Sequence, residues 1–288
     1  MRTLLLCLVP CVMACGDQPG EREPITVFAA ASLARPLSAI SDTLHERDGI
    51  VVQHELGGSL EHARKLTDLS RVPDVLVLAD DEVFASLLPS HIDWYVRFAT
   101  SRVVIAYQPG SRHAGEITAD NWWRVVTRPD VTIGRADSLT APVGRHALTV
   151  LQRAEPYYRE SGLTERLMAN AGNRHVRPNA TELAALLEAG EVDYILEYEA
   201  VARQYGFRTL TLPADLSVSA IYGMSIPRWA PNPDAALSFA TLVLSDAGKQ
   251  LLRDAHLSVL RVPVAIGNNV PSGITDLVRT VAVAPADR

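Results

Sequence analysis

The fold of this chain is indicated first by residues 25–32, which read ITVFAAAS. The β-branched and aromatic side chains of residues 25–30 are typical of a short buried strand. Apolar residues then recur at helical spacing over residues 33–47, and Gly49 follows them, so a helix is predicted there. Ser32 therefore lies at a turn between a strand and a helix.

The same order of strand, turn and helix follows at once. Residues 50–52 predict a second strand, Gly57, Gly58 and Ser59 a turn, and residues 60–69 a helix. Strands and helices continue to alternate until about residue 255. This alternation indicates an α/β fold with largely parallel strands.

The two serine turns are candidate anion-binding sites. A helix start leaves about four backbone N–H groups unpaired, and the helix dipole makes that end positive. Serine also caps helices in many proteins, and for Ser32 or Ser59 alone capping is the more frequent explanation. Two such turns in consecutive units point to one carboxyl edge of the sheet, where ligands of open α/β sheets bind.

Glu197 is a further candidate, because it lies near the end of a strand predicted at residues 193–198. One interpretation is a solvated carboxylate paired with Arg203. The other is a carboxylate in a ligand cleft. There it would repel an oxyanion unless it binds the anion's central metal or holds a proton.

The first residues predict export and anchoring. Arg2 precedes a short apolar run that ends in Val12, Met13, Ala14 and Cys15, which resembles a bacterial lipoprotein signal. We expect a signal peptide at residues 1–14, a lipid on Cys15, a tether at 15–24, and a periplasmic, membrane-anchored protein. The alternative is a membrane span, but a span needs about 20 apolar residues and this run is shorter.

Composition limits the partners and the chemistry. The net charge of −6 argues against nucleic acid and means that an anion site must rely on local donors. Removal of Cys7 and Cys11 with the signal peptide would leave one cysteine and no internal disulfide. The chain contains no P-loop, no Gly-x-Gly-x-x-Gly, no Gly-x-Ser-x-Gly and no His-Glu-x-x-His.

Several segments, in order along the chain, resemble periplasmic oxyanion-binding proteins, and more narrowly the tungstate/molybdate-binding proteins of the archaeal type. The longest reads LLEAGEVDYILEY at residues 186–198. The segments are residues 25–33, 58–61, 93–100, 121–122, 128–131, 134–137, 181–183, 186–198, 222–227 and 230–232. The resemblance implies a two-lobed, type II periplasmic binding protein with a central cleft and crossover hinge strands. Lobe 1 would comprise residues 25–105 with 225–288, and lobe 2 residues 106–224.

The resemblance also implies a function without catalysis or a cofactor. It implies a monomeric receptor that captures molybdate or tungstate and delivers it to an ABC permease in the membrane. The anion-binding residues carried over by position are Ala31, Ser32, Ser59, Ala141, Pro142, Val143 and Glu197, the last approaching the metal.

The chain departs from the family pattern in two places. Ala141 stands where the family has a metal-facing aspartate, with Asp137 four residues earlier, and the segment between Pro213 and Tyr222 is short. A tetrahedral anion held by neutral donors, with Glu197 alone nearby, is one outcome. Another is a changed ligand, such as sulfate, phosphate or a small organic anion. A third hypothesis is a secreted enzyme with Ser32 or Ser59 as nucleophile, which requires a histidine in reach.

Overall fold

The computed structural model describes residues 23–171 and 173–282. The predicted signal peptide, the lipidated Cys15 and residues 15–22 of the tether lie outside this range. No helix within the described ranges has the length and apolar character needed to cross a membrane.

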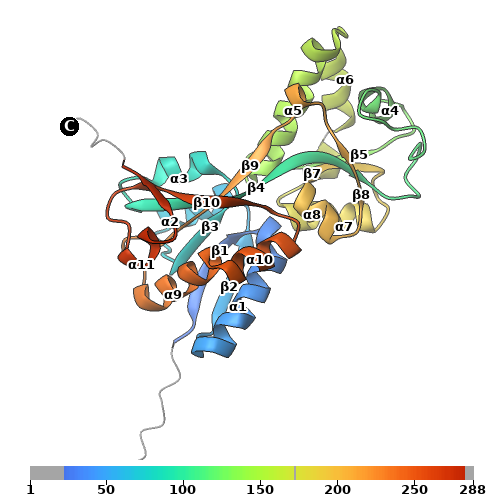
Figure 1. Cartoon of the computed structure of the whole chain (residues 1–288). Helices are drawn as coiled ribbons and strands as arrows, with labels where there is room; N and C mark the ends of the chain where they lie inside the picture. Colours follow the sequence, from blue (N-terminus) through green and yellow to red (C-terminus); the bar gives the residue numbers. More distant parts are fainter. Residues whose placement is uncertain (1–22, 172, 283–288) are drawn as a thin grey trace, which may run out of the picture.

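Two lobes, each a sheet with helices packed around it, are joined by strands β4 (Trp94–Tyr107) and β9 (Ser219–Ser225) (Figure 1). The first lobe combines the beginning and the end of the chain. Its elements are β1 (Ile25–Ala30), η1 (Ala31–Leu33), α1 (Ala34–Asp48), β2 (Val52–Gly57), α2 (Ser59–Thr67), β3 (Val75–Leu78), α3 (Asp81–Leu87), α9 (Pro233–Leu244), α10 (Asp246–Asp254), β10 (Ser258–Gly267), α11 (Ser272–Thr275) and β11 (Arg279–Val281).

The second lobe is built from the middle of the chain. Its elements are α4 (Trp122–Val126), β5 (Ile133–Ala136), α5 (Pro142–Tyr158), α6 (Leu163–Asn170), η2 (Asn173–His175), β6 (Val176–Arg177), α7 (Ala180–Glu188), β7 (Tyr194–Tyr198), α8 (Glu199–Gln204), β8 (Arg208–Thr211) and η3 (Ala214–Leu216). The α/β class predicted from the sequence is confirmed, since β1 pairs in parallel with β2 and β3, and β5 with β6 and β7.

Strand β4 belongs to both sheets. Its first part pairs with β10 and β9, and its last part, from Val103 onward, pairs with β7 and β8. Strand β9 pairs with β4 at residues 219–224 and with β3 at residues 223–225. The two strands are therefore the continuous links between the lobes.

Packing of α1 on the first sheet follows the helical spacing in the sequence. Leu37, Ile40 and Leu44 are fully buried on one face of this helix, against a core that includes Ile25 and Val27. Each such side chain stabilises the folded state by about 1.5–3 kcal/mol. This packing holds the strand ends of the first lobe in place.

Strand β2 differs from its prediction. It begins at Val52 rather than Ile50 and continues into Gly57, because it pairs with β1 from Ile25 to Ala30. As the edge strand of the sheet it has mixed burial, so its sequence lacks an apolar run. The turn predicted at Gly57, Gly58 and Ser59 therefore consists of Gly58 alone, and α2 starts at Ser59.

Candidate anion-binding site

A small cavity lies between the two lobes. Its volume, traced by the centre of a water molecule, is about 10 Å³, so a compact ligand fits best. The lining comprises Ala30, Ala31, Ser32, Gly57, Gly58, Ser59 and Ala79 from the first lobe, and Ala141, Pro142, Val143, Asn179, Ala180 and Tyr198 from the second. Six of the seven predicted site residues thus share one cavity, and Glu197 is not among the lining residues.

Four helix starts converge on this cavity. Ala31 begins η1, Ser59 begins α2, Pro142 begins α5 and Ala180 begins α7. The first-turn N–H groups of a helix are unpaired donors, and its dipole favours negative charge. No Lys, Arg, Asp or Glu is among the cavity's described lining residues. The cavity is therefore suited to an anion that is stabilised by backbone dipoles.

The two predicted serines are held in similar ways. The Oγ of Ser59 accepts a hydrogen bond from the backbone N–H of Ala79 at 3.0 Å. The Oγ of Ser32 accepts one from the hydroxyl of Tyr222 at 3.3 Å. Since each hydroxyl is used as an acceptor, its own proton remains for donation to a ligand.

Helix capping does not account for either serine. The N-cap of α2 is Gly58 and that of η1 is Ala30, and neither element has a side-chain cap. Both serine side chains are instead nearly inaccessible and directed toward neighbours of the cavity. Their burial is consistent with a ligand role rather than a solvent-exposed cap.

At the start of α5, the second lobe lines the cavity with Ala141, Pro142 and Val143. Ala141 precedes α5, a helix of 17 residues with Pro142 in its first turn and no side-chain cap. Asp137, the carboxylate closest in sequence, does not line the cavity and accepts the backbone N–H of Leu139 at 2.9 Å. No carboxylate in the described lining compensates for the alanine at position 141.

Glu197 is fully buried and its carboxyl group lies outside the lining. One carboxyl oxygen accepts the N–H of Tyr198 at 2.7 Å, and the other has no partner among the described residues. Burial raises the pKa of Glu197 to about 8, so the group is protonated at neutral pH. The interpretation as a solvated carboxylate paired with Arg203 is wrong, because Arg203 pairs with Glu199 at 2.7 Å.

Tyr198 and Asn179 line the cavity although the sequence did not single them out as ligands. The hydroxyl of Tyr198 is 3.1 Å from Nδ1 of His146, and its ring lies edge-on to that of Tyr222. Asn179 caps α7 by accepting the N–H of Glu182 at 3.0 Å. Residues 179–182 read NATE, a helix-capping pattern that could have marked this helix start in the sequence.

The buried His62 and the half-buried His146 lie behind the lining. Nε2 of His62 is 3.0 Å from the carbonyl oxygen of Ala29 and so links α2 to the end of β1. Burial lowers the pKa of His62 and that of His146 to about 4, so both are neutral at neutral pH. Within the described part of the chain, no histidine is hydrogen-bonded to Ser32 or Ser59, so the geometry gives no support to a serine nucleophile.

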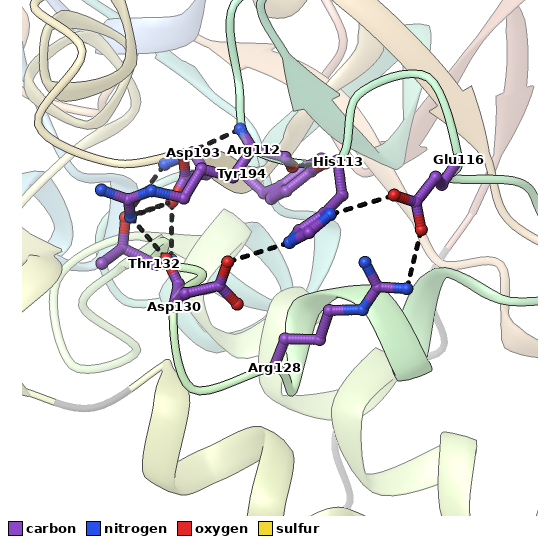
Figure 2. A network of polar contacts seen from close by, with 8 residues as sticks. All are labelled: Arg112, His113, Glu116, Arg128, Asp130, Thr132, Asp193 and Tyr194. Carbon is purple, nitrogen blue, oxygen red and sulfur yellow. Dashed lines mark hydrogen bonds and ion pairs between the residues drawn. The ribbon is translucent and has the colours of Figure 1, made fainter.

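A second polar cluster lies in the second lobe (Figure 2). Asp193 accepts hydrogen bonds from the backbone N–H groups of Arg112 and Thr132, and His113 bridges Glu116 and Asp130. Asp193 and Thr132 precede β7 and β5, whereas the cavity adjoins the opposite ends of these strands. The cluster therefore fastens the loop after β4 to the second lobe and is separate from the cavity.

Comparison with known proteins supports the resemblance stated above. The sequence pattern of the bacterial extracellular solute-binding protein family matches residues 25–258. The molybdate/tungstate-binding protein WtpA of Pyrococcus abyssi is 30% identical over 308 residues, covering 88% of this chain and 89% of that protein.

Two solved structures show the same fold. The sulfate-binding protein SubI of Mycobacterium tuberculosis H37Rv has a TM-score of 0.67 at 16% identity, covering 90% of this chain and 94% of its own. The periplasmic molybdate-binding protein of Azotobacter vinelandii has a TM-score of 0.66 at 16% identity, covering 82% and 100%. The fold is that of the type II periplasmic binding proteins, and the chain belongs to the bacterial extracellular solute-binding protein family.

Proposed function

We propose that this protein is an extracytoplasmic receptor that captures molybdate or tungstate for an ABC importer. The observation that carries the proposal is the convergence of four helix starts and two serine hydroxyls on one uncharged cavity. Oriented N–H dipoles stabilise a dianion without a balancing lysine or arginine. The named activity of the Pyrococcus relative supports the choice of anion.

The cavity is proposed to close around the anion. Lobe 1 would comprise residues 25–105 with 225–288 and lobe 2 residues 106–224, with β4 and β9 as the hinge. We further propose that the mature protein is a monomer, is anchored through lipid on Cys15, and presents its ligand to a membrane permease. The contribution of Glu197 to metal coordination stays a prediction.

Calorimetry on protein stripped of ligand tests the proposal. Molybdate and tungstate are expected to bind at micromolar concentration or below, with one site per chain. Elemental analysis after growth with both anions should find molybdenum or tungsten in the purified protein. The absence of binding by both anions would contradict the proposed function.

Sulfate is the second candidate ligand. No carboxylate in the described lining can widen a metal's coordination beyond four oxygens, and a tetrahedral anion needs only hydrogen-bond donors. Competition of sulfate against molybdate distinguishes the two candidates. A higher affinity for sulfate would assign the receptor to that anion.

A further inference from the structure

An ion pair crosses the cleft beside the cavity. Arg145, in the first turns of α5, pairs with the carboxylate of Asp80, which precedes α3 in the opposite lobe. The Asp80 side chain is only 5% exposed, and a second carboxylate, that of Glu82, lies 3.7 Å from Arg145. The Arg145 side chain is 35% exposed. Removing one partner of a pair in which the other charge is buried is costly, because that buried charge is left uncompensated.

The two residues are attached to the segments that line the cavity. Asp80 follows Ala79, whose N–H donates to Ser59, and Arg145 follows the lining residues Pro142 and Val143 in the same helix. A shift of either segment would move both the ion pair and the ligand donors. The ion pair therefore forms only when the two halves of the cavity are close together, and it stabilises that arrangement.

A second contact across the cavity points the same way. The hydroxyl of Thr181, in α7, donates to the carbonyl oxygen of Ala31 at 3.3 Å. By contrast, Arg35 and Gln204 join the lobes through α8 and do not line the cavity. Arg145 and Asp80 thus supply a charged link between the lobes beside the cavity.

We propose that Arg145 and Asp80 form a latch that holds the lobes closed over the bound anion and so sets its dissociation rate. The inference rests on the proposed function, but neither side chain lines the cavity. Because the two groups come from different lobes, the pair forms on closure and breaks on opening. It acts on how long the anion stays rather than on how it is recognised.

Dissociation of molybdate, chased with excess tungstate in a stopped-flow experiment, tests the latch. Arg145→Gln should raise the dissociation rate about tenfold and leave the association rate within about twofold. Asp80→Asn should do the same, since asparagine still accepts the N–H of Glu82 that Asp80 accepts at 2.8 Å. The double variant should be no worse than either single variant, because both remove one interaction.

Arg153→Gln is the matched control. Arg153 lies farther along α5 and bonds the carbonyl oxygen of Ser217, within the same lobe. An Arg145→Gln rate equal to that of this control, or additive effects in the double variant, would overturn the latch.

Small-angle X-ray scattering separates this proposal from the proposed function. If the wild-type protein binds neither anion, the proposed function fails, and the latch is then judged by the radius of gyration alone. A larger radius for Arg145→Gln than for Arg153→Gln supports the latch, and equal radii contradict it.

Discussion

Gly58 and Thr140 meet across the cleft, and their backbones approach so closely that no side chain fits between them. A Cβ atom placed on Gly58 would lie closer than 3.0 Å to the carbonyl oxygen of Thr140. Gly58 belongs to the first lobe and lines the cavity, and Thr140 belongs to the second lobe and precedes the lining residue Ala141. The glycine is needed for the approach of the lobes, since its φ of −77° suits any residue.

Gly58→Ala is therefore expected to hinder closure without unfolding the protein. The affinity for molybdate should fall at least tenfold, because the closed form is penalised and the binding-competent population shrinks. The melting temperature of the ligand-free protein should change little, since the new methyl group has room once the lobes separate. Calorimetry and thermal unfolding measure the two effects, and Gly110→Ala, where a Cβ meets nothing within 4 Å, is the control.

The serine hydroxyls should contribute directly to affinity. Removing the hydroxyl of Ser59 deletes one hydrogen bond to a charged ligand, worth about 2 kcal/mol, and should raise Kd about 30-fold. Ser32→Ala should act similarly. Ser86→Ala is the control, because that hydroxyl bonds the carbonyl oxygen of Val83 away from the cavity. Unchanged affinities in both cavity variants would remove the serines from the site.

The sequence alone was enough to find the two serine turns. Each follows a strand in consecutive strand–helix units, and parallel strands bring their carboxyl ends to one edge. That argument is local and it placed Ser32 and Ser59 at one cavity. The pair of Arg145 and Asp80 could not be found this way, since the two residues are 65 positions apart and meet only through the closure of the lobes.

Glu197 and Tyr198 show why strand ends are harder to interpret. Adjacent residues of a strand point to opposite faces, so a shift of one residue exchanges the cavity side for the buried side. Pairing with β4 places Glu197 opposite Val104 and Tyr198 opposite Val103. This register directs Tyr198 to the cavity and leaves Glu197 in the interior, and it depends on partners that no local pattern reveals.

Phosphate should bind much more weakly than molybdate or sulfate. Phosphate keeps a proton at neutral pH and needs an acceptor for it, and no carboxylate is present in the described lining. Where the O–H of phosphate faces an N–H or O–H donor of the lining, both donors are left unpaired. We therefore expect at least a 100-fold preference for fully ionised anions. Displacement of bound molybdate by an anion series at pH 7 measures the preference. Phosphate binding as tight as sulfate binding would contradict the prediction and would mean that a neutral oxygen of the lining accepts the phosphate proton.

Glu197 should make the folded protein less stable as the pH rises. Its pKa is about 8 when folded, against an ordinary value of 4.5, because burial disfavours the charged form. Between pH 4.5 and about 8 the folded state thus holds a proton that the unfolded state has released. The free energy of unfolding therefore falls as the pH rises across this range, and the fall is complete once the pH has passed through 8. The loss between pH 6.5 and about pH 9 should be about 2 kcal/mol in the wild-type protein.

Glu197→Gln removes this dependence, because the amide is neutral at every pH and still accepts the N–H of Tyr198. The variant should therefore gain stability relative to the wild type across that interval, as measured by urea unfolding at several pH values. His62 and His146 take up protons on unfolding mainly between about pH 4, their pKa in the folded protein, and pH 6.5, their ordinary pKa. They therefore contribute little to the change in stability between pH 6.5 and about pH 9. Glu199→Gln is the control. Partial burial would raise the pKa of Glu199, but the ion pairs with Arg102 and Arg203 lower it overall, so this carboxyl is already ionised across the interval. Parallel curves for the wild type and Glu197→Gln would mean that Glu197 is ionised in the fold and has a cationic or metal partner there.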